Sequence, residues 1–327
     1  MAVPAKIMQL TIPENKRIIC ISDVHGQLDI FKRLLGKVKF CDDDILILLG
    51  DICLGRHDNS QISHTLEFVM TLCKRPNVYA LRGSWECAER LPKNCDDAIK
   101  KLAATWFDSL PHIIETPSFV FVHAGISSNN LSEQDAHSCM LHLPDDVVFE
   151  KIVVAGHCPT LNHSKKILSC NPIINMERRV ILIDGGLDTW GVGQLNALFI
   201  ENGVFSYQSA DSLPVMVAPT AQKASGSDLS IVWVGGGEVE LVKAGDEFSL
   251  YKHLRSGKII ELANMSVDVM ENDAQGGEKS SYLRCSLGTD YHLPVAAGDE
   301  ITVLHRFSDR IYAKKDGVIG FYRTSAL

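Results

Sequence analysis

The sequence predicts a layered α/β domain followed by a smaller all-β domain. From residue 17 to about residue 207, short apolar runs alternate with amphipathic stretches, which is typical of layered α/β proteins. Past residue 209 there is no convincing helix, and Gly-Asp pairs open stretches of alternating polarity. At 327 residues the chain is also long for one ordinary domain, so we expect two.

Seven apolar runs are the predicted strands of the first domain, and all but the last are followed at once by polar or Gly-rich sequence. They are residues 18–22, 45–49, 78–81, 119–122, 152–155, 180–183 and 197–200. Residues 28–39, 62–75 and 96–110 carry apolar side chains at helical spacing and predict helices. Asp96 is the predicted N-cap of the third helix.

The rest of the chain has a different composition. Residues 213–228 contain Pro, Ala, Ser and Gly and predict a linker between domains at 1–212 and 229–327. In the second domain, Ala-Gly-Asp-Glu occurs at 244–247 and again at 297–300, each time before a stretch of similar polarity. This repeat suggests a duplicated β unit. The final stretch resembles small bacterial β-barrels of Src-homology type, so the second domain is predicted to be two such units.

Composition excludes several classes of protein. The chain is 46% hydrophobic and 22% charged, and no apolar run approaches the roughly 20 residues needed to cross a bilayer, so we expect no membrane association. No secretion signal is found, and ten cysteines without a C-x-x-C pair indicate reduced thiols, so a cytoplasmic protein is expected. A net charge of −8 disfavours nucleic acid as a partner.

Polar residues of the kind that bind metals follow the predicted strands. Asp23 and His25 follow the first run, Asp51 the second, His123 the fourth and His157 the fifth. One such residue alone is usually a cap or a satisfied polar group. Five in this order predict a metal site at the carboxyl ends of strands. Carboxylate and imidazole donors suit Mn, Fe, Zn or Mg, and Asp51 is placed to bridge two ions.

The ordered motifs D-x-H-G, G-D, R-G-x-x-E, H-A-G and G-H-x-P resemble the calcineurin-like metallophosphoesterases. They are most similar to the branch that holds phosphoprotein phosphatases and symmetric diadenosine tetraphosphatases. The resemblance implies an α+β fold, a four-layer αββα sandwich. It also implies two divalent metal ions, bound by Asp23, His25, Asp51, Ser84, His123 and His157.

Two departures from the family pattern affect catalysis. Where the family has Gly-Asn-His-Glu, this chain has Ser84 and Trp85, so a metal-binding Asn and the general acid His are replaced. Arg56 aligns with the family's phosphate-binding Arg only if one inserted residue is allowed, and Gly55 then replaces the Asp that orients the acid. We take Asp51, Arg56 and His57 as candidate catalytic residues, and Arg56 and Arg82 as candidate substrate-binding residues. His112 is a further candidate acid.

Two functions follow as expectations. The first is a phosphoesterase that uses metal-activated water on a phosphoprotein, a dinucleoside polyphosphate or another nucleotide. The second is a weakened phosphatase that acts as a phosphate-binding or protein-binding regulatory module. In either case the C-terminal β domain is a candidate surface for a protein partner.

Overall fold

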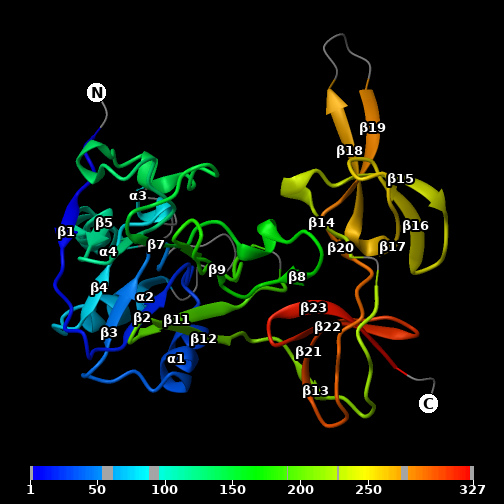
Figure 1. Ribbon diagram of the computed structural model, residues 1–327, viewed down its shortest axis with the longest axis horizontal. Coiled ribbons are helices and arrows are strands. Elements are labelled where there is room, and N and C mark those ends of the chain that lie inside the picture. The colour runs from blue at the N-terminus through cyan, green and yellow to red at the C-terminus, as the bar shows by residue number, and fades with distance from the viewer. Residues whose placement is uncertain are drawn as a thin grey trace. The chain divides into compact units, whose positions relative to one another are not determined.

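The structure, a computed structural model, describes residues 3–53, 62–87, 96–189, 191–226, 228–273 and 279–324. Contacts divide the chain into two units, Met1–Thr160 with Asn171–Ser212, and Leu161–Cys170 with Leu213–Leu327. The elements of both units are drawn in Figure 1. Among the described residues, no helix combines the length and the apolar character that crossing a membrane would need.

The first unit is built on two sheets. The six-stranded sheet has the order β1 (Ile7–Gln9), β5 (Ile113–Glu115), β6 (Phe119–Val122), β7 (Ile152–Ala155), β10 (Val180–Leu182) and β9 (Ile173–Asn175). The five-stranded sheet has the order β12 (Val204–Ala210), β11 (Leu195–Glu201), β2 (Ile18–Ile21), β3 (Ile45–Leu48) and β4 (Val78–Ala80). All seven apolar runs therefore form strands, as predicted.

Three neighbouring strands run parallel in each sheet. They are β2, β3 and β4 in one sheet and β6, β7 and β10 in the other. Within each set the carboxyl ends lie at the same edge of the sheet, so the residues that follow these strands are brought close together.

The two sheets pack face to face. Cys20 and Ile47 from one sheet and Phe121 from the other lie in the same buried cluster. Neighbouring residues such as Ile19 point to the opposite face and belong to a second cluster. Because both faces of β2 are covered, the whole strand is buried, which explains its unbroken apolar sequence.

Three α-helices cover the outer face of the five-stranded sheet, namely α1 (Leu28–Lys37), α2 (Ile62–Leu72) and α4 (Asp97–Ser109). Their apolar side chains, including Phe31, Leu66 and Phe107, share one cluster with β2 and β3. The carboxylate of Asp96 accepts a hydrogen bond of 2.7 Å from the N–H of Ala98. Asp96 therefore caps α4, as predicted.

The outer face of the six-stranded sheet is covered by residues 126–149. This segment includes two 3-10 helices, η1 (Leu131–Glu133) and η2 (Ser138–Met140). Ile126, Cys139 and Phe149 from the segment pack against Val120 and Val153 of the sheet. The α+β sandwich predicted from the sequence is confirmed. In the described part of the chain its fourth layer consists of this segment rather than of long α-helices.

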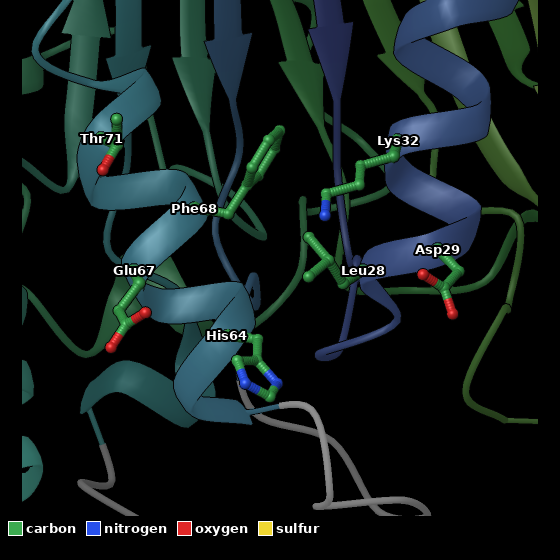
Figure 2. A pocket seen from close by; sticks show the side chains of 7 residues that line it. All are labelled: Leu28, Asp29, Lys32, His64, Glu67, Phe68 and Thr71. Atoms are coloured by element: carbon green, nitrogen blue, oxygen red, sulfur yellow. The ribbon is translucent and has the colours of Figure 1, made fainter.

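A surface pocket of about 490 Å³ opens between α1 and α2 (Figure 2). Lys32 of α1 reaches towards Phe68 of α2, with Nζ 5.1 Å from the centre of the ring. Asp29 and Glu67 place negative charge on the same lining. The pocket is formed by the helical layer, and none of the predicted metal ligands lines it.

The described part of the second unit contains strands and 3-10 turns without an α-helix. One sheet has the order β13 (Val215–Val217), β21 (Glu300–Arg306), β22 (Arg310–Lys315), β23 (Val318–Arg323) and β8 (Leu168–Ser169). Another has the order β17 (Ile259–Ala263), β16 (Phe248–His253), β15 (Glu238–Lys243), β19 (Lys279–Cys285) and β18 (Val267–Asp273), and β14 (Ser230–Val232) pairs with β20 (Leu287–Thr289). Each five-stranded sheet contributes to its own small core.

The predicted turn residues form hairpins in this unit. Asp316 and Gly317 join β22 to β23, with φ of 50° and 76°, as a type I′ turn requires. The two Ala-Gly-Asp-Glu copies lead into β16 and β21, which lie in different sheets and each begin a hairpin. The two copies therefore occupy similar positions in two separate sheets.

Two short strands of this unit are not predicted by the sequence. β13 lies within 213–228, the stretch that its composition predicts to be a linker, and pairs with β21. β8 lies within 161–170 and pairs with β23. Strands of two or three residues are too short to show a readable alternation, and composition averaged over a longer stretch conceals them. The division into domains at 1–212 and 229–327 stays a prediction.

Candidate metal centre

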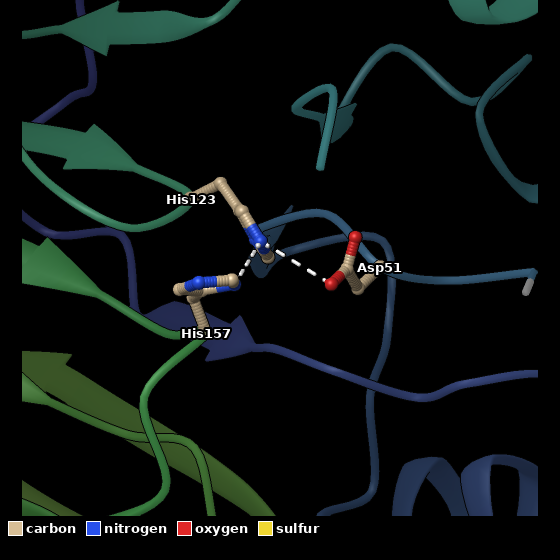
Figure 3. Close-up of side chains that lie close together, drawn as sticks. All are labelled: Asp51, His123 and His157. Atoms are coloured by element: carbon tan, nitrogen blue, oxygen red, sulfur yellow. Dashed lines mark hydrogen bonds and ion pairs between the residues drawn. The ribbon is translucent and has the colours of Figure 1, made fainter. Parts of the chain in front are cut away.

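Side chains from the ends of four strands meet in one cluster. Asp23 and His25 follow β2, Asp51 follows β3, His123 follows β6 and His157 follows β7. Their donor atoms form two groups, Asp23 with His25 and Asp51, and Asp51 with His123 and His157. Within each group these atoms lie within 4.8 Å of one another. Figure 3 shows His123 between the other two members of the second group. Asp51 belongs to both groups.

The backbone at these residues is unusual. Asp23, His25, Asp51 and His157 have φ of 58°, 50°, 49° and 65°, in the left-handed region that side chains with a Cβ rarely adopt. Each such residue costs about 1–3 kcal/mol and is retained only where the surrounding contacts determine it. The contacts of these residues therefore hold the turns after β2, β3 and β7 in a backbone conformation that is locally unfavourable.

Glycines allow these turns to approach one another. A Cβ at Gly156 would lie 1.7 Å from Ser22 Oγ, and one at Gly83 would lie 2.1 Å from the backbone nitrogen of Asp51. Gly50 has a φ of 95°, and a Cβ there would lie 2.6 Å from Gly83 Cα. No larger residue fits at these positions without moving the turns that carry the cluster.

Asp51 is held at both carboxylate oxygens by α3 (Ser84–Cys87). The N–H of Trp85 donates to Oδ1 at 2.8 Å, and the hydroxyl of Ser84 donates to Oδ2 at 2.9 Å. Oδ2 also lies 3.3 Å from His123 Nε2. The structure therefore brings Ser84, a predicted ligand, to the centre of the cluster.

His123 is oriented by a main-chain carbonyl. Its Nδ1 lies 2.9 Å from the oxygen of Leu49, which can only accept, so Nδ1 carries a proton and Nε2 faces the cluster. Nε2 is 3.1 Å from His157 Nδ1, and the two rings meet edge to face (Figure 3). Two imidazole nitrogens and a carboxylate oxygen thus converge on one point.

Asp23 and His25 form the other side of the cluster. Asp23 Oδ2 accepts hydrogen bonds from the Ser22 hydroxyl and from the N–H of His157, the latter at 2.9 Å. Asp23 Oδ1 lies 3.7 Å from His25 Nε2. The other ring nitrogen of His25, Nδ1, lies 4.0 Å from Oδ2 of Asp188. His25 therefore stands between two buried carboxylates.

Glu86 connects two of the turns. Its carboxylate is fully buried and accepts hydrogen bonds from the N–H groups of Asp51 and Ile52, both at 2.8 Å, and of Gly83 at 3.0 Å. These bonds tie the turn after β3 to the turn after β4. Glu86 is thus a positioning residue for Asp51.

Burial and close charges determine the protonation of the cluster. Burial raises the pKa of Asp23 to about 7, and the neighbouring Asp51 adds to the rise. Burial alone would lower the pKa of His123, but its contact with Asp51 raises that pKa to about 10. Burial opposes ionisation of Asp51, yet the charge and hydrogen bond of His123 hold the pKa of Asp51 below its usual range. The metal-free cluster therefore keeps a proton on His123 at neutral pH.

The family model for calcineurin-like phosphoesterases matches residues 16–204, which is more than half of the chain. The chain belongs to the calcineurin-like phosphoesterase family. The resemblance inferred from the ordered motifs is confirmed. No curated protein matches the chain by sequence.

Several solved structures have low similarity to this chain. They include a protein serine/threonine phosphatase from Saccharomyces cerevisiae with similarity to human phosphatase PP5, at 11% identity and a TM-score of 0.47, covering 64% of this chain and 85% of that one. A putative diadenosine tetraphosphatase has 17% identity and a TM-score of 0.43, covering 63% and 99%. A cold-active protein-tyrosine phosphatase of a psychrophilic Shewanella species has 16% identity and a TM-score of 0.42, covering 64% and 83%. Similarities this distant do not inform on substrate.

Calcineurin-like phosphoesterases bind divalent metal ions, and the donor atoms of this cluster fit such ions. The separations of 3.1, 3.3 and 3.7 Å between its neighbouring donors are those expected around an ion with bonds of about 2.0–2.2 Å. Among the described residues, the ion partners of Asp23 and Asp51 are histidines. A divalent cation would therefore supply positive charge that this buried site needs.

Trp85 is the residue that the motif alignment places opposite the general acid expected from the family. Its side chain is partly buried against the apolar cluster under the helices, and its ring meets that of His25 edge-on with the centroids 6.2 Å apart. An indole N–H does not titrate in the range where a general acid works. At this position the described part of the site thus has an aromatic ring that cannot donate a proton as a general acid would.

The remaining predicted residues lie elsewhere. Arg82 Nη1 pairs with Asp108 at 2.8 Å and its Nη2 donates to the carbonyl of Glu86 at 3.5 Å, so among the described residues its guanidinium bonds to none of the five converging side chains. His112 Nδ1 accepts a hydrogen bond of 2.9 Å from the N–H of Lys6, and burial lowers the pKa of this histidine. The structure therefore brings neither of them to the cluster. Arg56 and His57 lie outside the described residues.

Four buried residues around the cluster were not predicted as site residues, namely Ser22, Glu86, Asp184 and Asp188. Glu86 lies within the R-G-x-x-E motif and Asp184 directly follows the predicted strand at 180–183, so the sequence carried a signal for both. Burial raises the pKa of Asp184 well above its usual value, and the nearby Asp23 adds to the rise. Asp188 belongs to no motif, and only the fold brings it to His25.

Proposed function

We propose that this chain is a metal-dependent phosphoesterase that hydrolyses phosphate esters at the cluster around Asp51. The observation that carries the proposal is that Asp51 belongs to both groups of donor atoms. A carboxylate in this position can bridge two ions about 3.5–4 Å apart. When bound, such a pair stabilises charge on phosphate oxygens and acidifies an attacking water.

The residues of the chain arrange this site before metal binds. Ser84 and Trp85 hold the two oxygens of Asp51, and Glu86 holds its backbone. Preorganisation of this kind lowers the cost of binding both the ions and the substrate. Ser84 offers a hydroxyl where the family has an amide oxygen, and a hydroxyl is the poorer metal ligand of the two. We therefore propose that the group with His123 and His157 binds its ion more weakly than the other group does.

The donor atoms indicate the kind of metal. Both groups consist of carboxylate and imidazole donors without a thiolate. Such donors suit Mn, Fe, Zn or Mg. We propose manganese as the ion for the first assays.

Trp85 sets the kind of substrate. A positioned general acid contributes about 10²–10⁴-fold to the rate, and most to substrates whose leaving group is a strong base. Without it, the preferred substrates are those that release a stabilised anion. Aryl phosphates and the phosphoanhydrides of dinucleoside polyphosphates meet this condition, whereas phosphoserine requires protonation of an alkoxide.

The observation at Trp85 also favours a second function, a regulatory module that binds a phosphate ligand without turnover. In this alternative the aromatic ring of Trp85 replaces the acid because no reaction is required. The second unit would then bind a protein partner. The alternative predicts ligand affinity with background hydrolysis.

Assays of the full chain with manganese distinguish these proposals. Substituted aryl phosphates, dinucleoside polyphosphates and phosphoserine peptides are compared, with Asp51→Asn as the inactive variant and Asp108→Asn as the charge-matched control away from the cluster. The phosphoesterase proposal expects hydrolysis that Asp51→Asn abolishes and that falls steeply as the leaving group becomes more basic. Hydrolysis at background on every substrate, with phosphate binding retained, would favour the regulatory module.

A further inference from the structure

His25 is placed between two buried carboxylates that face different ring nitrogens. Nε2 lies 3.7 Å from Asp23 Oδ1, on the side of the donor group that Asp23 and Asp51 complete. Nδ1 lies 4.0 Å from Asp188 Oδ2. The side chains of Asp23 and Asp188 are 2% and 4% exposed, so both carboxylates act on the ring with little screening by solvent.

A metal-binding histidine must present a nitrogen lone pair to the ion. A neutral imidazole carries one proton, and the nitrogen that holds it cannot bind metal. When a cation is bound beside Asp23 it compensates that carboxylate, and the negative charge of Asp188 beside Nδ1 then favours the form with the proton on Nδ1, which leaves the Nε2 lone pair directed towards the ion. At 4.0 Å the attraction is electrostatic rather than a direct hydrogen bond.

The loop that carries Asp188 is pinned to the sheet. Gly186 forms a bridge with Gln194, and a Cβ at Gly185 would lie 2.1 Å from the carbonyl oxygen of Gln194. Leu187, the residue before Asp188, packs against the apolar cluster under the helices. The N–H of Thr189 donates to the carbonyl of Gly186 at 3.1 Å. Both neighbours of Asp188 are thus anchored, which holds the carboxylate beside His25.

We propose that Asp188 is a positioning residue for the metal site: it keeps the proton of His25 on Nδ1 and thereby directs Nε2 to the ion shared with Asp23 and Asp51. The inference rests on the metal binding proposed above and does not require turnover. It assigns a role to a residue outside every recognised motif. Partners that hydrogen-bond a metal-binding histidine typically change metal affinity by about 10–100-fold when they are removed, and we expect the longer contact of Asp188 to lie at the lower end of this range.

Metal titration of the full chain tests the role. Manganese affinity is measured by calorimetry for the wild type, Asp188→Asn and the control Asp108→Asn. Each is also measured in a His157→Asn background, which removes a ligand from the other donor group only. We expect Asp188→Asn to weaken binding of the ion at His25 by about 10-fold, Asp108→Asn to leave it unchanged, and all variants to keep the circular dichroism of the wild type.

A spectroscopic readout separates positioning from general loss of structure. In protein with ¹⁵N-labelled histidine and bound zinc, the His25 signals are assigned by their absence in His25→Asn. With zinc below saturation, we expect His25 of the wild type to show a protonated Nδ1 and a zinc-bound Nε2, and Asp188→Asn to show this form in a smaller fraction of the protein. Equal manganese affinity in wild type and Asp188→Asn, or no manganese binding by the wild type, would overturn the inference. If Asp188→Asn weakens binding but no phosphate ester is hydrolysed, the proposed function fails and the role of Asp188 stands.

Discussion

The hydroxyl of Ser84 donates a hydrogen bond of 2.9 Å to Oδ2 of Asp51, the carboxylate shared by both donor groups. In the family pattern this position is an Asn and the next is the acid His, whereas here the next is Trp85. Ser84 therefore contacts the shared carboxylate in this chain, while the residue expected to donate the proton is replaced by Trp85. Metal binding by the two donor groups and proton donation to the leaving group can therefore be tested separately.

Restoring the family residues tests the loss of the acid. The double change Ser84→Asn with Trp85→His should raise hydrolysis of phosphoserine peptides more than hydrolysis of aryl phosphates, because only the alkoxide leaving group needs strong protonation. The gain is bounded by about 10²–10⁴-fold. Adding Gly55→Asp supplies the orienting carboxylate and should increase the gain. Rates are compared at saturating manganese, with Ser84→Asn alone as the control.

A wild type that is already fast on phosphoserine peptides, and slower after the double change, would contradict this interpretation. Trp85 would then belong to a working site with its acid elsewhere. Because Trp85 packs against the apolar cluster, the double change can also lower stability. Thermal unfolding of the wild type and the double variant detects such a loss.

Asp51→Asn should affect both ions. An amide presents one oxygen instead of a carboxylate that is shared between the two donor groups. We expect the wild type to bind two manganese ions and the variant to bind at most one, more weakly. Elemental analysis after dialysis and calorimetric stoichiometry give the counts. Two ions bound by Asp51→Asn with wild-type affinity would remove Asp51 from the role of bridge.

Metal affinity should rise with pH. The pKa of His123 in the metal-free site is raised to about 10 and that of Asp23 to about 7, so near neutral pH both groups hold a proton more strongly than usual. Metal binding requires the deprotonated forms. Manganese binding at pH 7 should therefore release protons, and the affinity should increase as the pH rises from 6 towards 10. Calorimetry in buffers of different ionisation enthalpy measures the protons released, and none released would contradict the assignment.

Two glycines make a matched pair. Gly156→Ala places a Cβ 1.7 Å from Ser22 Oγ, within the turn that carries His157, and should lower both stability and manganese affinity. Gly36→Ala lies in α1 with open space around the added Cβ and should raise the free energy of unfolding by about 0.5–1 kcal/mol without changing metal affinity. Urea unfolding and manganese titration of both variants provide the comparison.

The segment 161–170 should be required for the second unit. Leu168 is fully buried where β8 pairs with β23, whereas its neighbour Ile167 is 37% exposed. Leu168→Ala should therefore cost about 2–5 kcal/mol of stability, and Ile167→Ala less than about 0.5 kcal/mol. A fragment of residues 213–327 lacks β8 and should be less stable than the same unit in the full chain. Equal unfolding midpoints would show that β8 adds nothing.

The sequence by itself determined the α+β class, the seven apolar strands of the first unit and the five residues that converge on the metal cluster. It could do so because parallel strands bring their carboxyl ends to one edge, so a motif placed directly after a strand has a predictable position. Glu86 lies inside such a motif, so its position beside the cluster could have been predicted in the same way.

Only the tertiary structure decided the contacts that depend on packing between distant segments. Asp188 reaches His25, Leu168 and Ser169 join β23, and Arg82 is drawn to Asp108. None of these follows from periodicity or motif spacing, because each is determined by how loops and helices pack after the sheets have formed. The left-handed backbone at Asp51 and its neighbours in the cluster has the same origin, since it persists only because surrounding contacts outweigh its local cost.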